Sequence, residues 1–171
     1  MNKPLFDKWN SQKKGLQKQY ANFLKRNSKK NLKKLGALAQ EKHQKVFQEV
    51  DCLDCANCCT SIPPIVTKAD ATRIAKYLGI SKLEFENTYL TFDEDGDAVF
   101  RSIPCVFLLE DNKCSIYEYR PKACREYPHT NGFEFVENLK LHKSNMLYCP
   151  ATFHIVQEML SFVSGSNKPR G

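Results

Sequence analysis

The sequence lacks any long apolar run, and it shows no internal repeat. No stretch of about 18 or more apolar residues occurs among its 171 residues, so we expect no membrane-spanning helix. Residues 1–6 contain neither an apolar stretch nor a cleavage-like site, so we expect no signal peptide. The default expectation is therefore a cytoplasmic location, where thiols are kept reduced.

Cysteine is the residue that the chain has in excess. Four thiols fall within eight residues as a C-x2-C-x2-C-C run, and four more follow at wider spacings. The eight residues are Cys52, Cys55, Cys58, Cys59, Cys105, Cys114, Cys124 and Cys149. Thiolates are soft ligands that select zinc, copper(I) or iron–sulfur clusters. The sequence therefore predicts that all eight cysteines are metal ligands.

Disulfides are the alternative use of an even number of cysteines. A reducing compartment argues against them. Geometry does so too, because the neighbouring Cys58 and Cys59 could not pair with each other without strain.

The charge is divided unevenly along the chain. Residues 1–50 hold thirteen Lys or Arg and three Asp or Glu, whereas residues 51–171 hold thirteen and sixteen. We therefore expect a basic helical extension over residues 1–49, a metal-binding domain over residues 50–163 and a frayed tail over residues 164–171. The boundary falls near Val50, just before the first cysteine cluster.

The sequence predicts that the basic extension is helical. Residues 5–49 are rich in Lys, Gln, Leu and Ala, and they contain only Gly15 and Gly36 as breakers. Apolar residues recur at helical spacing, so each helix has a face that needs a partner surface. We expect two helices, with a break around Asn27–Ser28 or at Gly36.

Capping signals predict helices in the domain. Thr67 followed by Asp70 resembles a capping box, opening a helix that ends at Gly79. Ser81 opens a second helix, to about Leu90. A short helical turn should carry Cys124. Pro150 suits the first turn of a closing helix.

Strand signals are fewer. Asp95–Gly96 between apolar residues predicts a hairpin. Residues 105–109 and 114–117 read as two strands joined by a turn, and residues 133–136 as a further strand. The expected fold class is α+β and rich in helix: a small metal-organised domain with a few short strands and a helical N-terminal extension.

The geometry of the first cluster has two solutions. In a helix, Cys52, Cys55 and Cys59 would share one face. In a loop, Cys52, Cys55 and Cys58 could wrap one cluster, as at the start of the bacterial ferredoxin run. Spacing alone does not separate zinc from an iron–sulfur cluster. Nearby cations could offset thiolate charge, or they could be ordinary surface residues: Arg101, Arg120, Lys122 and Arg125.

Spaced motifs extend the cysteine pattern. They comprise Cys52-x2-Cys55-x2-Cys58-Cys59, Asp70-x2-Arg73-Ile74-Ala75, Leu78-Gly79-Ile80-Ser81, Phe85, Pro104-Cys105-Val106-Phe107-Leu108, Cys114-x-Ile116-Tyr117-x2-Arg120-Pro121-x2-Cys124-Arg125-x-Tyr127-Pro128 and Cys149-Pro150. Over about residues 50–160 the chain resembles the YkgJ-type CxxCxxCC family of zinc or iron chelators. The resemblance implies metal chelation by these cysteines, with a [4Fe–4S] cluster favoured over zinc. A related cysteine region occurs in the longer flagellin lysine N-methylases.

Three functions follow as hypotheses. The first is a metal-chelating protein with a redox or cluster-handling role. The second is a cluster-dependent enzyme resembling a lysine methylase, with Asp70, Glu126, Tyr127 and His129 as acid–base candidates, although Asp70 also reads as a helix cap.

The third is a zinc-scaffolded nucleic-acid-binding protein, in which the basic extension contacts phosphates. A solvated helix face is the more ordinary explanation of the lysine runs, and a protein partner could also bind there. His43, His142 and His154 are weaker candidates for metal ligands than the cysteines.

Overall fold

A computed structural model describes residues 3–26 and 32–165. Contacts group the chain into two compact units: unit 1 comprises residues 1–51 and 128–171, and unit 2 comprises residues 52–127. The first break between them falls beside the predicted boundary near Val50. Unit 1 groups residues 128–163 with the N-terminal helices. The domain organisation predicted from the sequence stays a prediction.

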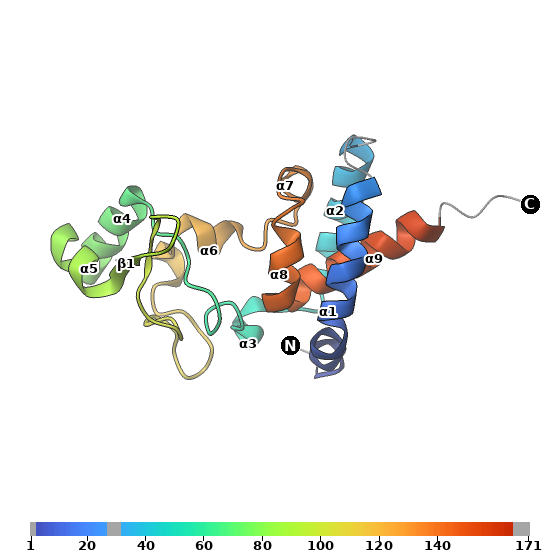
Figure 1. Cartoon of the computed structure of the whole chain (residues 1–171). Coiled ribbons are helices and arrows are strands. Elements are labelled where there is room, and N and C mark those ends of the chain that lie inside the picture. Colours follow the sequence, from blue (N-terminus) through green and yellow to red (C-terminus); the bar gives the residue numbers. More distant parts are fainter. Residues whose placement is uncertain (1–2, 27–31, 166–171) are drawn as a thin grey trace, which may run out of the picture. The chain divides into compact units, whose positions relative to one another are not determined.

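Unit 1 is an assembly of helices. It comprises α1 (Lys3–Arg26), α2 (Leu32–Phe47), α7 (Phe133–Glu137), α8 (His142–Tyr148) and α9 (Pro150–Gly165) (Figure 1). Helix α9 packs against α1, α2 and α8. Its surface is completely buried over little more than one turn, where Thr152, Phe153, Ile155 and Val156 are all 0% exposed. The closing helix predicted from Pro150 is thus confirmed, and it forms the centre of unit 1.

The apolar faces of the N-terminal helices are buried in unit 1. Trp9 and Tyr20 of α1 are 3% and 1% exposed. Their polar atoms are also satisfied: Trp9 Nε1 donates to the Met146 carbonyl at 2.8 Å, and the Tyr20 hydroxyl donates to the Leu139 carbonyl at 2.9 Å. Buried Tyr and Trp normally need such acceptors, so α1 is fixed to the C-terminal part of the chain by both packing and hydrogen bonds.

Helix α1 ends at Arg26 and α2 begins at Leu32. Asn27–Ser28, one predicted position, falls outside the described residues. Gly36, the other predicted position, is wrong as a break because it lies inside α2. A Cβ atom at Gly36 would stand 3.6 Å from the Gly132 carbonyl oxygen, an ordinary van der Waals distance, so the helix passes next to the Gly132 backbone there.

The strand predicted at residues 133–136 is wrong. This segment forms the single-turn helix α7, with Phe135 fully buried and Phe133 60% exposed. Phe135 stacks on His142 with ring centroids 4.2 Å apart, and its carbonyl is 2.9 Å from His142 Nε2. Alternating aromatic residues over four positions do not distinguish a strand from one helical turn, and the contacts with α8 decide the conformation.

Unit 2 contains short helices and one small sheet. Its elements are α3 (Cys52–Cys55), α4 (Lys68–Leu78), α5 (Lys82–Tyr89), β1 (Leu90–Phe92), β2 (Ala98–Phe100), the 3₁₀ helix η1 (Tyr117–Tyr119) and α6 (Lys122–Glu126). Strands β1 and β2 are antiparallel, with Leu90 opposite Phe100. The predicted hairpin at Asp95–Gly96 is confirmed, and Gly96 supplies a φ of 82° in its turn.

The two predicted helices of unit 2 are confirmed as well. Thr67 and Asp70 form a complete capping box on α4, and Gly79 ends the helix with a φ of 72°. Ser81 caps α5 by accepting from the Glu84 N–H at 3.1 Å. Together with the sheet, these helices enclose an apolar core that includes Ile74, Phe85, Phe100, Phe107 and Ile116. The fold is therefore α-rich α+β, as predicted.

The strands predicted at residues 105–109 and 114–117 are wrong. Only an isolated bridge joins Leu108 to Cys114. The Cys105 N–H donates to the Cys59 carbonyl at 2.8 Å, and the Leu108 N–H donates back to the Cys105 carbonyl at 3.0 Å. The second bond closes a turn over residues 105–108, and this turn interrupts the extended backbone that a continuous ladder would need. In the described ranges, no helix is both long and apolar enough to cross a membrane.

Asp70 joins two helices of unit 2 through one buried carboxylate, which is 1% exposed. It accepts from Thr67 Oγ1 at 2.6 Å, from Arg73 Nη2 at 2.6 Å and from the Lys122 N–H, the first of α6, at 3.1 Å. Burial alone would raise the pKa of Asp70, but these hydrogen bonds outweigh it and lower the pKa. The helix-cap interpretation is confirmed and extends to α6, which carries Cys124.

We expect Asp70→Asn to lower the free energy of unfolding by about 2–3 kcal/mol, because a buried, hydrogen-bonded charge is lost. The lowered pKa means that Asp70 stabilises the fold above its unfolded value of about 3.9 and that this contribution is lost as the pH falls through the folded value. Denaturant titrations across the acid range should therefore show a shallower pH dependence for the variant. Asp95→Asn, in the exposed β1–β2 turn, is the matched control and should change stability by less than about 0.5 kcal/mol.

Candidate metal centre

The first cysteine cluster is a short helix followed by a turn. Cys52 and Cys55 lie in α3, and the Ala56 N–H donates to the Cys52 carbonyl at 2.9 Å. Ala56 then adopts a φ of 44°, which ends the helix. Cys58 and Cys59 follow in the turn. The helical arrangement with Cys52, Cys55 and Cys59 on one face is therefore wrong, and the loop alternative is closer to the structure.

Hydrogen bonds and packing bring the second group of cysteines to the first. The backbone bond from Cys105 to the Cys59 carbonyl links the two groups directly. Cys105 and Cys114 both pack against the apolar core of unit 2. Cys124 is held on α6, whose first N–H is bound by Asp70. Seven of the eight cysteines thus belong to unit 2.

Four of these thiols lie within electrostatic reach of one another: Cys59, Cys105, Cys114 and Cys124, which we call the thiol quartet. Burial, together with negative charge on the other three thiols, raises the pKa of Cys124 to about 12. Burial raises the pKa of Cys105 to about 11, with added repulsion from Cys59 and Cys114. The pKa of Cys114 is raised by burial and then by negative charge on Cys59. Every pair within the quartet therefore interacts.

Cys59 differs from its partners. Its Sγ lies 3.9 Å from that of Cys58. The hydrogen bond from Cys58 lowers the pKa of Cys59 to about 7, against the opposing effect of burial. Burial raises the pKa of Cys55, and the charge of Cys59 adds to that rise. Cys59 thus interacts with cysteines on both sides of the sequence gap, which places it at the centre of the thiol group.

Cys149 belongs to unit 1. It is 8% exposed, at the junction of α8 and α9, and its Sγ accepts from the Thr152 N–H at 3.4 Å. This bond caps the start of α9. The role of Cys149 as a metal ligand stays a prediction.

The quartet's chemistry suits a thiolate-bound metal. Its donors are all soft sulfurs, partly buried and mutually repelling when ionised, and a cation would relieve that repulsion. No disulfide links any of the eight cysteines in this structure. Within residues 3–26 and 32–165, no three His, Cys, Asp or Glu side chains already stand at coordinating positions.

Among the nearby cations, Arg120 acts on the thiols. Its positive charge lowers the pKa values of Cys114 and Cys124, opposing burial. Its guanidinium lies 3.7 Å from the centre of the Tyr117 ring. Arg101 is engaged elsewhere, donating to the Asn87 and Leu90 carbonyls. Arg125 donates to the Arg120 carbonyl at 2.7 Å, so it helps to hold that segment.

All four histidines lie in unit 1. His43 Nδ1 is 2.9 Å from Thr130 Oγ1, and His154 Nε2 is 3.0 Å from the Leu5 carbonyl. Burial lowers the pKa of His142 to about 4, so this residue is neutral at ordinary pH. His129 has a φ of 59° in the loop before α7. Unit 2 therefore presents sulfur as its soft donor and contains no imidazole.

Together, the helix-rich fold and the thiol quartet define a metal-binding cysteine-cluster protein. The sequence profile of the CxxCxxCC family, described as "putative zinc- or iron-chelating domain", matches residues 51–150. Because this match covers more than half of the chain, the protein belongs to that family.

One curated relative extends the comparison. An uncharacterized protein of Methanocaldococcus jannaschii is 35% identical over 82 residues, which cover 46% of this chain and 44% of the relative. The match thus spans less than half the length of either protein. No solved structure shows significant similarity to the chain.

We expect zinc binding to the reduced, metal-free protein at pH 7 to release about three to four protons per ion bound by the quartet. Thiols must ionise to bind metal, and the raised pKa values of Cys105, Cys114 and Cys124 keep them protonated beforehand. Cys59, with a pKa of about 7, contributes a fraction of a proton. An indicator dye in weak buffer measures the release. A release near one proton per ion would contradict ligation by the quartet.

Arg120→Gln should raise the pKa values of Cys114 and Cys124 by removing the nearby positive charge. Alkylation of the metal-free protein, followed against pH with mass mapping of each cysteine, measures this shift. Lys113→Gln is the matched control, because Lys113 precedes Cys114 but pairs with Asp111 at 2.7 Å. Equal shifts in the two variants would show that the pKa values of the thiols depend on the net charge of the protein and not on the position of Arg120.

Proposed function

We propose that unit 2 holds a [4Fe–4S] cluster on the thiol quartet and serves in electron transfer or cluster handling. The observation that carries the proposal is the mutual interaction of Cys59, Cys105, Cys114 and Cys124. Four cysteine thiolates are the usual ligand set of such clusters. The two cysteine groups of the sequence would then supply a single site.

The surroundings of the quartet support a redox role. The potential of an iron–sulfur cluster depends on net charge, on hydrogen bonds to sulfur and on exposure. Arg120 provides positive charge to Cys114 and Cys124. The backbone N–H of Phe107 lowers the pKa of Cys105, and that of Ile116 lowers the pKa of Cys114, as donors to sulfur do. These groups would favour the more negative, reduced state of a bound cluster.

Zinc is the alternative metal, and it has a different consequence. A four-cysteine zinc site is closed and chemically inert, so unit 2 would then be a structural scaffold. The loops from Cys105 to Cys124 contain little regular structure, which suits a metal-stabilised fold of either kind. In both cases metal loss should destabilise unit 2, because binding energy becomes folding energy in small metal domains.

We expect anaerobically purified protein to be brown, to absorb near 400 nm and to contain about four iron and four sulfide per chain. Cys114→Ser should remove most of the iron and lower the melting temperature, because it deletes a quartet ligand. Cys52→Ser is the matched control, since Cys52 is exposed in α3 outside the quartet. Colourless protein with stoichiometric zinc would contradict the cluster and indicate the structural zinc scaffold instead.

A further inference from the structure

Unit 1 carries a large excess of positive charge. It contains seventeen Lys or Arg and seven Asp or Glu, whereas unit 2 is net negative. Part of that charge is neutralised locally: Lys45 pairs with Glu158 at 2.8 Å and Lys42 lies 3.8 Å from the same carboxylate. The remaining charge is concentrated elsewhere, mainly on α1.

One face of α1 is a row of lysines. Lys3, Lys14, Lys18 and Lys25, which we call the lysine ridge, are all exposed and recur at helical spacings of four, seven and eleven. They lie opposite the buried face made by Trp9, Leu16 and Tyr20. Within the described residues, no ion pair joins a ridge lysine to a carboxylate. From Lys3 to Lys25 the ridge extends about 33 Å, at 1.5 Å per residue.

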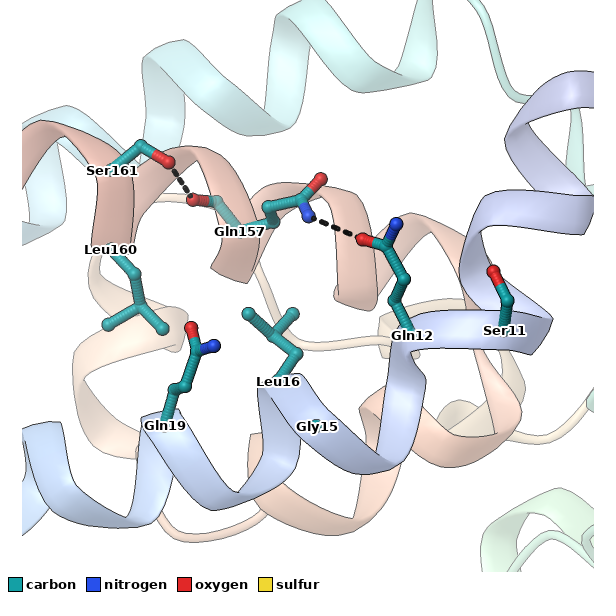
Figure 2. Close-up of a pocket in the computed structure, with 8 residues that line it drawn as sticks. All are labelled: Ser11, Gln12, Gly15, Leu16, Gln19, Gln157, Leu160 and Ser161. Atoms are coloured by element: carbon teal, nitrogen blue, oxygen red, sulfur yellow. Dashed lines mark hydrogen bonds between the residues drawn. The ribbon is translucent and has the colours of Figure 1, made fainter.

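A polar groove lies beside the ridge. It has a volume of about 580 Å³ and runs between α1 and α9. Figure 2 shows Gln12 and Gln19 reaching from α1 toward α9, with Gln157 on the other side. Gln157 Nε2 donates to Gln12 Oε1 at 3.3 Å. Gly15 leaves open space, because no atom lies within 4 Å of the position its Cβ would take.

The groove and the ridge are continuous on α1. Ser11 and Gly15, which line the groove, lie three residues before Lys14 and Lys18, and such positions are neighbours on a helix surface. Amides that donate and accept hydrogen bonds therefore border a row of positive charges.

We propose that the ridge and groove of unit 1 bind the sugar–phosphate backbone of a nucleic acid. The lysines would contact phosphates, and the groove amides would hydrogen-bond sugars or base edges. The ridge length matches about ten base pairs at 3.4 Å each. This inference does not depend on the metal in unit 2.

Charge and composition favour a nucleic acid over an acidic protein. Protein interfaces depend on apolar or aromatic anchors. Along the described part of α1, none of the large apolar side chains is among the exposed ones. The residues between the ridge lysines are polar, including Asn10, Ser11 and Asn22. A surface of this kind suits repeated phosphate charges and lacks anchors for a protein partner.

The test is fluorescence anisotropy of the full chain with labelled random-sequence 20-mers, as duplex DNA and as single-stranded RNA, over a salt series. Four lysine–phosphate contacts predict a log–log slope near −3.6 for the duplex. The variant Lys14→Glu/Lys18→Glu/Lys25→Glu should bind at least tenfold more weakly. Lys68→Glu/Lys76→Glu/Lys82→Glu, an equal charge change on helices of unit 2 at two exposed lysines and the half-buried Lys82, should stay within about threefold of the unmodified protein.

Gly15→Leu tests the groove separately. The new side chain meets open space and suits a helix better than glycine does, so α1 should be at least as stable. Affinity should nevertheless fall about tenfold, as expected when one or two hydrogen bonds are blocked.

The proposal predicts salt-dependent binding that the ridge variant loses and the unit 2 variant keeps, with unchanged circular dichroism and metal content in both. Absence of binding at 50 mM salt would overturn it. So would equal loss in the two triple variants, or competition by polyglutamate as effective as that by unlabelled nucleic acid, which would indicate an acidic protein partner instead.

Discussion

Repulsion among partly buried thiolates is the constraint on which unit 2 depends. Cys59, Cys105, Cys114 and Cys124 are close enough for each to disfavour ionisation of the others, and burial adds to that cost. Without a cation the group is held as neutral thiols, with Cys59 nearest to ionising. Metal binding reverses this preference, because it makes the thiolate form the stable one. Folding, proton release and metal content are therefore linked in this unit.

The two units are stabilised in different ways. Unit 1 buries a continuous apolar surface around α9, with Trp9 and Tyr20 fixed by hydrogen bonds, so helix packing accounts for its stability. Unit 2 has a smaller core and long irregular connections. There the buried carboxylate of Asp70 supplies order by binding α4 to the start of α6. The metal site and the basic surface thus belong to units with distinct sources of stability.

Local signals in the sequence predicted the elements that local interactions determine. The Thr67 cap and the Asp95–Gly96 hairpin were confirmed, because few residues suffice to specify them. The strands within residues 105–117 were predicted wrongly, because a turn over residues 105–108 interrupts the extended backbone, and Cys105 bonds instead to the Cys59 carbonyl, 46 residues earlier in the chain. The first cluster was left open between helix and loop, since nothing in the sequence indicates the positive φ of Ala56. Residue type alone pointed to sulfur as the metal donor, which stays a prediction, whereas the grouping of four thiols into the quartet required the fold.

Arg120 shows how the site's charge limits its function. A four-cysteine zinc site carries a formal charge of about −2, and one adjacent guanidinium brings the local sum to about −1. In that case Arg120 would act only as a counter-ion. For a cluster that gains an electron, the same guanidinium would stabilise the reduced state more than the oxidised one, since attraction grows with the charge on sulfur. The position of Arg120 beside Cys114 and Cys124 therefore has a functional consequence chiefly if the metal is redox-active.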